Sequence, residues 1–103
     1  MEMQEKYDVA TGYENLFAGY VPFTHDLKIW PDFFGPVEDR TKTFEVRRND
    51  RNFQIGDYLC LREWWDGHYT GRFLYMEITY VLPGGLFGVE AGYVVMGIAP
   101  MDE

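Results

Sequence analysis

The stretch KTFEVRR, residues 42–48, alternates apolar and polar side chains and predicts a β-strand. Successive side chains of a strand point to opposite faces, so Phe44 and Val46 would share one face, expected to be the core side. Glu45 and Arg47 would share the opposite face. A carboxylate and a guanidinium would then lie side by side, which suits recognition of polar planar groups and phosphates.

The segments around this strand carry patterns of further short elements. Pro31 is well placed as a first helical residue, and Gly35-Pro36 weakens the helix that follows, so one short or broken helix is expected over residues 31–40. Asp66-Gly67 predicts a hairpin turn. The other expected strands are residues 25–29, 57–64, 72–82 and 93–98.

This order of elements predicts an α+β fold that is mainly β. We expect a small pseudobarrel of about five to six strands, with one or two short helices that plug one end. A chain of 103 residues forms one domain, and 47% hydrophobic residues supply its core. Residues 24–103 would make up this domain. Residues 1–23 are expected to be an N-terminal extension, within which residues 13–18 offer a further short helix.

The charge of the chain restricts the class of ligand. A net charge of −8 excludes a general coat protein for nucleic acid, because non-specific binding depends on neutralising phosphates with Lys and Arg. Seven of the nine basic residues nevertheless lie between Thr24 and Glu63. A local group of cations in an acidic protein suits a small anionic ligand or a short strand.

The cellular compartment is suggested by what the sequence lacks. Cys60 is the only cysteine, so no intramolecular disulfide can form, and within its apolar run we expect a buried, inert thiol. The N-terminus does not have the pattern of a signal peptide, and no apolar stretch approaches membrane-spanning length. A cytoplasmic protein without membrane contact is expected. His25, His68 and Cys60 have no metal-ligand spacing, so neither a metal nor a cofactor is expected.

Two other readings of the polar and aromatic residues remain open at this stage. Glu45 and Arg47 could simply pair with neighbours across a solvated sheet. Trp30, Trp64 and Trp65 are candidates for stacking on a ligand, and the alternative is partial packing on the rim of the barrel.

Three segments carry a resemblance to a known family: HDLKIWPDFF (25–34), KTFEVRRNDRNFQIGDYLCLREW (42–64) and YVLPGGLFGVEAGYVVMGI (80–98). In this order they resemble a bacterial and phage family of uncharacterised ASCH-type domains of the PUA-like superfamily. The resemblance covers residues 24–98. It implies a PUA-like pseudobarrel whose helix and Lys/Glu/Arg strand line a cleft. It also implies recognition of RNA or modified nucleotides, and some relatives of this kind are amidohydrolases that act on acylated cytidine.

Carried over position by position, the resemblance implies a set of site residues. The cleft residues would be Lys28, Lys42, Glu45 and Arg47, with a second tier of His25, Trp30, Asn49, Asp50 and Arg51. Two positions depart from the pattern. Arg40 replaces a glycine, so the turn there is expected to differ, since a left-handed backbone would cost Arg roughly 1 kcal/mol. Glu45 replaces the threonine of the amidohydrolases, which weakens a hydrolase assignment.

These inferences lead to three functional expectations. The first is a binding module whose cleft holds a nucleobase, nucleotide or short RNA through Glu45 and Arg47, with Lys28 and Lys42 near the phosphate. The second is an amidohydrolase acting on an acylated cytidine-type nucleoside, with Lys42 as the best catalytic candidate, although Glu45 beside it would favour a permanent cation. The third is a phage or mobile-element interaction domain that contacts a protein partner through its N-terminal extension.

Overall fold

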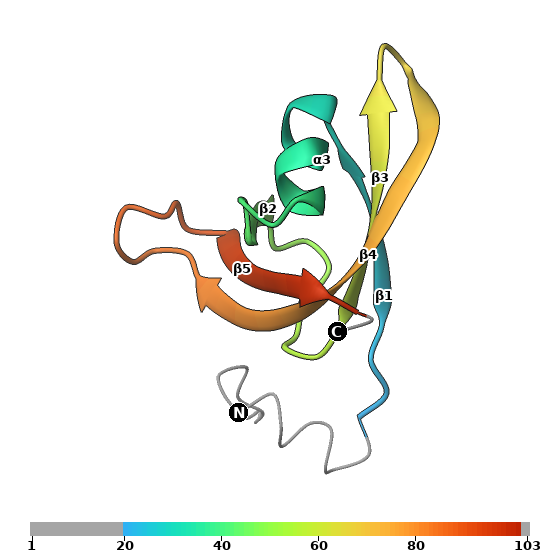
Figure 1. Cartoon of the computed structure of the whole chain (residues 1–103). Helices are drawn as coiled ribbons and strands as arrows, with labels where there is room; N and C mark the ends of the chain where they lie inside the picture. Colours follow the sequence, from blue (N-terminus) through green and yellow to red (C-terminus); the bar gives the residue numbers. More distant parts are fainter. Residues whose placement is uncertain (1–19, 102–103) are drawn as a thin grey trace.

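The protein is built on one strongly curved β-sheet with a single helix in the part of the chain that the structure describes (Figure 1). The computed structural model describes residues 20–101. Its elements are β1 (Thr24–Ile29), α3 (Pro31–Glu38), β2 (Phe44–Arg48), β3 (Tyr58–Trp65), β4 (His68–Pro83) and β5 (Tyr93–Pro100). The mainly-β α+β pseudobarrel expected from the sequence is confirmed, with five strands. The expected helix over residues 13–18 lies outside the described residues.

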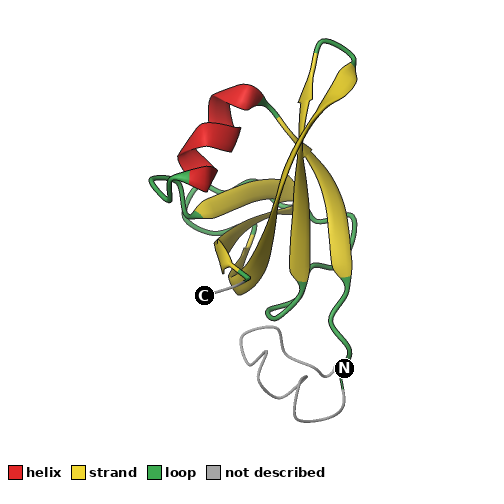
Figure 2. Ribbon diagram, turned by 45° about the vertical axis from the view of Figure 1, so that its right-hand side comes forward, coloured by secondary structure: helices red, strands yellow, loops and turns green. Residues whose placement is uncertain are grey.

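The sheet has the strand order β1-β3-β4-β5-β2. The pair β1–β3 is parallel and the other three pairs are antiparallel. The 16-residue strand β4 pairs with β3 through its first half and with β5 through its second half. The register shifts between Arg62 and Trp64 and between Ile78 and Tyr80, and such bulges increase the bend of a strand. The sheet therefore curls into a half-barrel, and its edge strands β1 and β2 approach each other (Figure 2).

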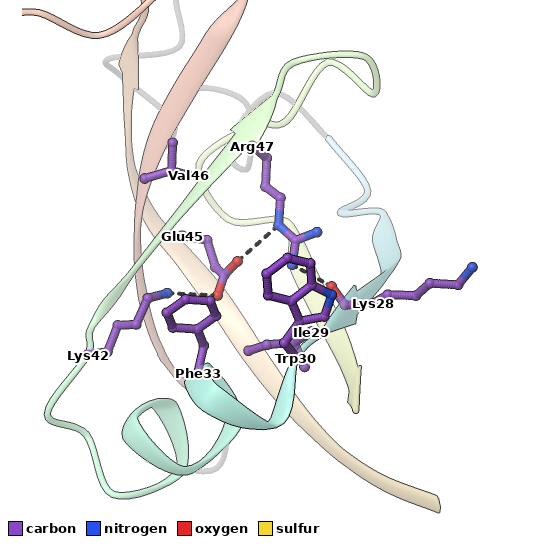
Figure 3. Close-up of a pocket in the computed structure, with 8 residues that line it drawn as sticks. All are labelled: Lys28, Ile29, Trp30, Phe33, Lys42, Glu45, Val46 and Arg47. Carbon is purple, nitrogen blue, oxygen red and sulfur yellow. Dashed lines mark hydrogen bonds and ion pairs between the residues drawn. The ribbon is translucent and has the colours of Figure 1, made fainter. Parts of the chain in front are cut away.

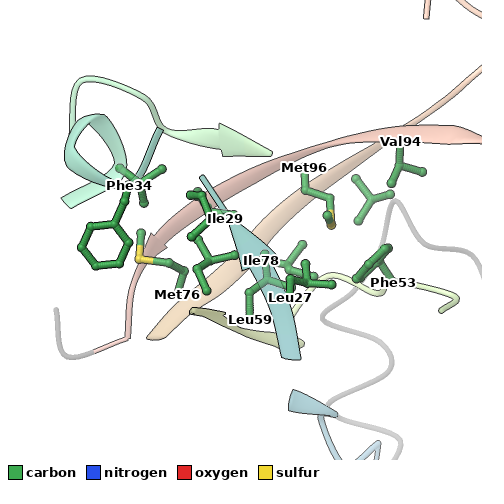
Figure 4. Packing of buried hydrophobic residues seen from close by; sticks show 13 residues of the cluster. Leu27, Ile29, Phe34, Phe53, Leu59, Met76, Ile78, Val94 and Met96 are labelled. Carbon is green, nitrogen blue, oxygen red and sulfur yellow. The ribbon is translucent and has the colours of Figure 1, made fainter. Parts of the chain in front are cut away.

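The core fills the inside of this curl (Figure 4). Alternation along the strands buries one face of each, as in β1, where Leu27 and Ile29 are buried and Lys28 is exposed. The helix contributes Phe34 and Val37, each only 1% exposed. The remaining buried hydrophobic residues are Phe53, Leu59, Leu61, Met76, Ile78, Val81, Val94, Met96 and Ile98. The helix therefore closes the curl as a second layer.

The helix is continuous from Pro31 to Glu38, although Pro36 lies inside it. Pro31 occupies its first turn, where the missing N–H removes no helical hydrogen bond. Pro36 accepts a hydrogen bond from the Lys42 N–H (3.0 Å), which ties the end of the helix to the segment that leads into β2. The helix ends at Glu38, two residues before the expected last residue, Arg40.

The expectation for the two faces of residues 42–48 was wrong. Glu45 is buried (4% exposed), whereas Phe44 and Val46 are 44% and 50% exposed. The alternation is as expected, but alternation defines two faces without saying which one points inward. The inward face of β2 meets a pocket that holds two cations, and these accommodate the buried carboxylate.

Two smaller expectations also change. Arg40 adopts the left-handed conformation (φ 70°), so the turn is formed with arginine where the resembling family has glycine. Cys60 is half-buried rather than buried, because it lies on the outer face of β3 between the buried residues Leu59 and Leu61. Within residues 20–101, no helix has the length and apolar character needed to cross a membrane.

Candidate functional site

A pocket of about 520 Å³ lies at the seam between the two edge strands, next to the start of α3 (Figure 3). A volume of this size is typical of small-molecule sites. The residues that line it are Lys28, Ile29, Trp30, Phe33, Lys42, Glu45, Val46 and Arg47. The pocket thus combines the end of β1, the first turn of the helix and the inward face of β2.

Glu45 is the centre of the polar part of this pocket. Its Oε1 accepts a hydrogen bond from Arg47 Nε at 2.9 Å, and its Oε2 accepts one from Lys42 Nζ at 3.2 Å. The side chains of Lys42 and Arg47 are 20% and 25% exposed, whereas that of Glu45 is 5% exposed. One buried anion between two partly exposed cations leaves a local charge of +1, which favours an anionic group on a ligand.

Local structure explains why these three side chains meet. Glu45 and Arg47 are two residues apart in a strand and therefore share a face. Lys42 precedes the strand, and its main-chain N–H is held by Pro36. The Lys42 ammonium also donates to the main-chain oxygen of Phe44 at 2.8 Å. Two acceptors thus hold this ammonium, an arrangement suited to a fixed cation.

Two aromatic rings stand at the mouth of the pocket. Trp30 precedes the helix and Phe33 lies in its first turn, and their side chains are 59% and 44% exposed. Their ring centroids are 6.3 Å apart with planes inclined by 19°. The Lys42 ammonium lies 5.6 Å from the centroid of Phe33. Exposed, nearly parallel rings beside paired cations form a surface on which a planar ligand can stack.

Lys28 was expected to be a cleft cation, and its side chain is not one. Its ammonium lies 4.0 Å from the centroid of the Trp64 ring, on the outer face of the sheet. Figure 3 shows this side chain pointing away from Glu45. The reason is alternation, because the neighbouring Leu27 and Ile29 point inward. Lys28 contributes its main-chain oxygen, which accepts a hydrogen bond from Arg47 at 2.8 Å.

His25 lies in a separate polar cluster rather than in the pocket. Its Nε2 is 2.8 Å from Asp57 Oδ2, and Asp57 is completely buried. The same carboxylate accepts hydrogen bonds from the Tyr20 hydroxyl and from the main-chain N–H groups of Phe23 and Gln54. This cluster fastens the start of β1 to the start of β3. The pattern Gly56-Asp57 indicated only the beginning of a strand, so sequence reasoning missed it.

The other three residues of the second tier also lie outside the pocket lining. Asn49 Oδ1 accepts a hydrogen bond from the Phe53 N–H at 3.1 Å and so shapes the loop after β2. Arg51 donates to the main-chain oxygen of Asp26 at 2.8 Å. Asp50 is 61% exposed and lies 3.7 Å from Arg51. These residues have structural contacts in the loop and at the seam.

Sequence reasoning also missed two residues that line the pocket. Phe33 follows Trp30 by three residues, and this helical spacing could have indicated that the two rings are neighbours. Val46 was assigned to the core side, but its side chain lies on the other side of β2 from Glu45 and Arg47 (Figure 3). No local pattern of the sequence indicated that Val46 lines the pocket.

A second ion pair lies outside the pocket. Glu63 is buried (5% exposed) and accepts hydrogen bonds from Arg72 at 3.1 and 3.2 Å and from the Thr70 hydroxyl at 2.6 Å. The Arg72 guanidinium, then the Thr70 hydroxyl, hold the pKa of the Glu63 carboxyl below its usual value. Arg72 also lies 4.3 Å from the centroid of Phe34. This pair joins the β3–β4 hairpin to the helix. Its hydrogen bonds explain why the Glu63 carboxylate is buried although Glu63 does not line the pocket.

The two adjacent tryptophans of β3 differ in their surroundings. Trp64 is half-buried and makes an edge contact with Tyr69, with centroids 4.8 Å apart. Trp65 is 58% exposed near the hairpin turn. Neither lines the pocket, so Trp30 is the tryptophan positioned to stack on a ligand there. Among residues 20–101, no group of three His, Cys, Asp or Glu side chains is arranged to hold a metal ion.

Comparisons with known proteins place this pocket inside a recognised domain. A family model matches residues 24–98, a range that contains every lining residue, and the family is described as "Domain of unknown function (DUF3850)". The chain is also 40% identical over 57 residues to the "Uncharacterized 12.9 kDa protein in GpA 3'region" of Escherichia phage P2. That alignment covers 55% of this chain and 52% of the phage protein, so the matched part spans about half the length of that relative.

Proposed function

The chain belongs to the DUF3850 family. We propose that its seam pocket binds a nucleobase, nucleotide or short RNA segment, the function that the resemblance to ASCH-type domains of the PUA-like superfamily implies. The observation that carries this proposal is the convergence of Lys42, Glu45 and Arg47 beneath an exposed Trp30. Each part matches one feature of a nucleotide. The indole supplies a stacking surface for the base, and the excess positive charge suits a phosphate.

The acidic charge balance of the chain is consistent with this scale of ligand. The net charge of −8 disfavours long duplexes, while the pocket concentrates two cations around one acid. A pocket of about 520 Å³ has room for a single nucleotide or for one base of a short unpaired strand. The proposal therefore concerns recognition of one base and its phosphate.

Isothermal titration calorimetry with the four nucleosides, their monophosphates and short oligonucleotides tests the proposal. We expect a monophosphate to bind more tightly than its nucleoside, and added salt to weaken the difference, because Lys42 and Arg47 act through charge. Trp30→Ala is expected to weaken binding about tenfold, since stacking on an aromatic ring contributes about 1–3 kcal/mol per base. Absence of binding by all of these ligands would refute the proposal.

The chain offers a matched control for the tryptophan. Trp65 is 58% exposed, nearly the same as Trp30 at 59%, but it lies at the β3–β4 hairpin outside the pocket. Trp65→Ala should therefore leave binding unchanged. Equal losses in both variants would indicate a non-specific aromatic effect and would contradict the assignment of the pocket.

The same samples decide between binding and the amidohydrolase alternative. Lys42 is engaged by the Phe44 carbonyl and by Glu45, and the hydrolase threonine position is occupied by Glu45. We therefore expect acetylated cytidine to bind without turnover. Release of acetate at a high protein concentration, abolished in Lys42→Ala, would replace the binding proposal with the hydrolase one.

A further inference from the structure

The register of β2 determines the direction in which its main-chain groups point. The Ile98 N–H donates to Thr43 O at 3.0 Å, and the Asn49 N–H donates to Gly92 O at 2.8 Å. Main-chain groups of an antiparallel strand alternate between the two sides, and both groups of one residue point the same way. The main-chain N–H and C=O groups of residues 43, 45, 47 and 49 therefore point toward β5. The main-chain groups of Phe44, Val46 and Arg48 point the other way, toward the open seam.

A contact of Phe44 confirms this direction independently. Its main-chain oxygen accepts the Lys42 ammonium at 2.8 Å, and Lys42 lines the pocket at the seam. Val46 has the same parity and also lines the pocket. Because the Val46 side chain lies on the far side of β2 from Glu45 and Arg47, the part of Val46 that faces the pocket is its main chain (Figure 3).

Along the seam, side-chain cations bind several main-chain oxygens. Arg51 binds Asp26 O, Arg47 binds Lys28 O and Lys42 binds Phe44 O, each at 2.8 Å. Within residues 20–101, the Val46 N–H and C=O have no hydrogen-bond partner. Unpaired main-chain groups are usual along an edge strand, and those of Val46 face the pocket, where they are free to pair with a ligand.

From this geometry we propose that the main-chain N–H and C=O of Val46 read the pairing edge of the bound base, an inference that rests on the proposed function. An N–H and a C=O of one extended residue form an adjacent donor and acceptor on a rigid edge. Every unmodified nucleobase has an adjacent acceptor and N–H donor on its pairing edge. The base would stack on Trp30 while Val46 satisfies this edge and Lys42 and Arg47 bind the phosphate.

This arrangement predicts a distinctive specificity. The N–H and C=O of Val46 have no rotamers, so they are preorganised for binding. They should discriminate strongly between bases with and without an N–H on the pairing edge, and only weakly among the four unmodified bases. Replacing the edge N–H by N-methyl removes one hydrogen bond and places a methyl group against the Val46 oxygen. A site built to hydrogen-bond a group rejects analogues that lack it.

The test compares the four nucleoside monophosphates with counterparts in which every N–H on the pairing edge carries methyl instead. In the full-length protein, we expect methylation to weaken binding about tenfold or more, equivalent to ~1.4 kcal/mol. Val46→Pro removes the N–H and is expected to weaken the unmethylated ligands similarly. Proline is tolerated in an edge strand where the N–H faces away from the sheet.

A control variant isolates the main chain of Val46. Arg48→Pro removes an N–H of the same parity from the same strand, outside the pocket lining, and should leave binding unchanged. Binding of the methylated nucleotides is measured on the unaltered protein. This comparison therefore tests the role of Val46 even if Val46→Pro does not fold.

The outcomes separate this inference from the proposed function. Binding of a monophosphate with equal affinity for its methylated counterpart overturns the role of Val46 and leaves the proposed function standing. A loss in Arg48→Pro as large as in Val46→Pro also overturns it. Absence of binding by all four monophosphates overturns the proposed function, and the inference falls with it.

Discussion

The guanidinium of Arg47 donates a hydrogen bond of 2.8 Å to the main-chain oxygen of Lys28, which joins the two edge strands of the curled sheet. A continuous ladder would close a barrel completely and leave no edge. Here an arginine bridges the gap instead, and the space on the pocket side of that bridge remains open. The contact that closes the fold therefore also forms a wall of the candidate site.

Arg51 provides a test of this closure outside the pocket. It binds Asp26 O at 2.8 Å, and its side chain is 44% exposed. Hydrogen bonds of charged groups contribute about 1.5–3 kcal/mol, and this exposure lowers the expected value to about 1 kcal/mol for Arg51→Ala. Urea denaturation measures the loss. Arg48→Ala is the control, because Arg48 contacts Tyr93 and does not bridge the seam. An equal loss in both variants would contradict closure by arginine.

Glu45 provides a test of the charge balance in the pocket. Glu45→Gln keeps the shape but leaves Lys42 and Arg47 without their shared anion. We expect the free energy of unfolding to fall by about 1–3 kcal/mol, less than for a fully buried pair because both cations are partly exposed. Added salt should narrow the difference, since it screens the repulsion between the two cations. Denaturation at two salt concentrations measures both effects, and an unchanged variant would show that the pair is not coupled to stability.

The sequence predicted the order of elements well because it depends on local patterns. Alternation in residues 25–29 and the turn signal at Asp66-Gly67 act over a few residues, and the structure has a strand and a hairpin at these places. The direction of β2 could not be predicted in this way. Whether Glu45 or Phe44 points inward depends on Lys42 and on the distant edge β1, which local alternation does not contain.

The candidate site shows the same division between local and distant information. Resemblance indicated Lys28 as a cleft cation, although the alternation of β1 already placed its side chain opposite the buried Leu27 and Ile29. Glu45 and Arg47 share a face, as their spacing suggested, and Lys42 contacts Glu45 although its parity is that of Phe44. The buried role of His25 could not be predicted from local patterns. Its partner, Asp57, is 32 residues away in the sequence, and the β1–β3 pairing brings the two together.

The Tyr20–Asp57 contact predicts a dependence of stability on alkaline pH. Burial of the hydroxyl, then its hydrogen bond to Asp57, raise the pKa of Tyr20 above its usual value of about 10. A raised pKa stabilises the fold fully below pH ~10. Above that pH the unfolded chain releases a proton that the folded chain retains, so stability falls until the folded pKa is reached. Unfolding by urea between neutral pH and pH ~11 should show a shallower decline in Tyr20→Phe than in the unaltered protein. Parallel declines would show that the hydroxyl is not coupled to folding.

Two glycines predict opposite effects of the same substitution. Gly35 lies inside α3, and a Cβ added there meets no atom within 4 Å beyond its chain neighbours and the backbone of the helix. Gly35→Ala should therefore raise the free energy of unfolding through helix propensity, but by less than the usual ~0.5–1 kcal/mol, because Pro36 disfavours a helical residue with a Cβ directly before it. A Cβ at Gly84 would overlap Glu90 O and lie 2.6 Å from Tyr93 O, at the base of the loop between β4 and β5. Neither contact is the end of a flexible side chain, so the main chain must move, and Gly84→Ala should cost about 2–3 kcal/mol. Thermal and urea unfolding of both variants measure the two changes. A neutral Gly84→Ala would mean that the loop can separate from β5 without cost, and the close packing of its two ends would then have no role in stabilising the edge of the sheet.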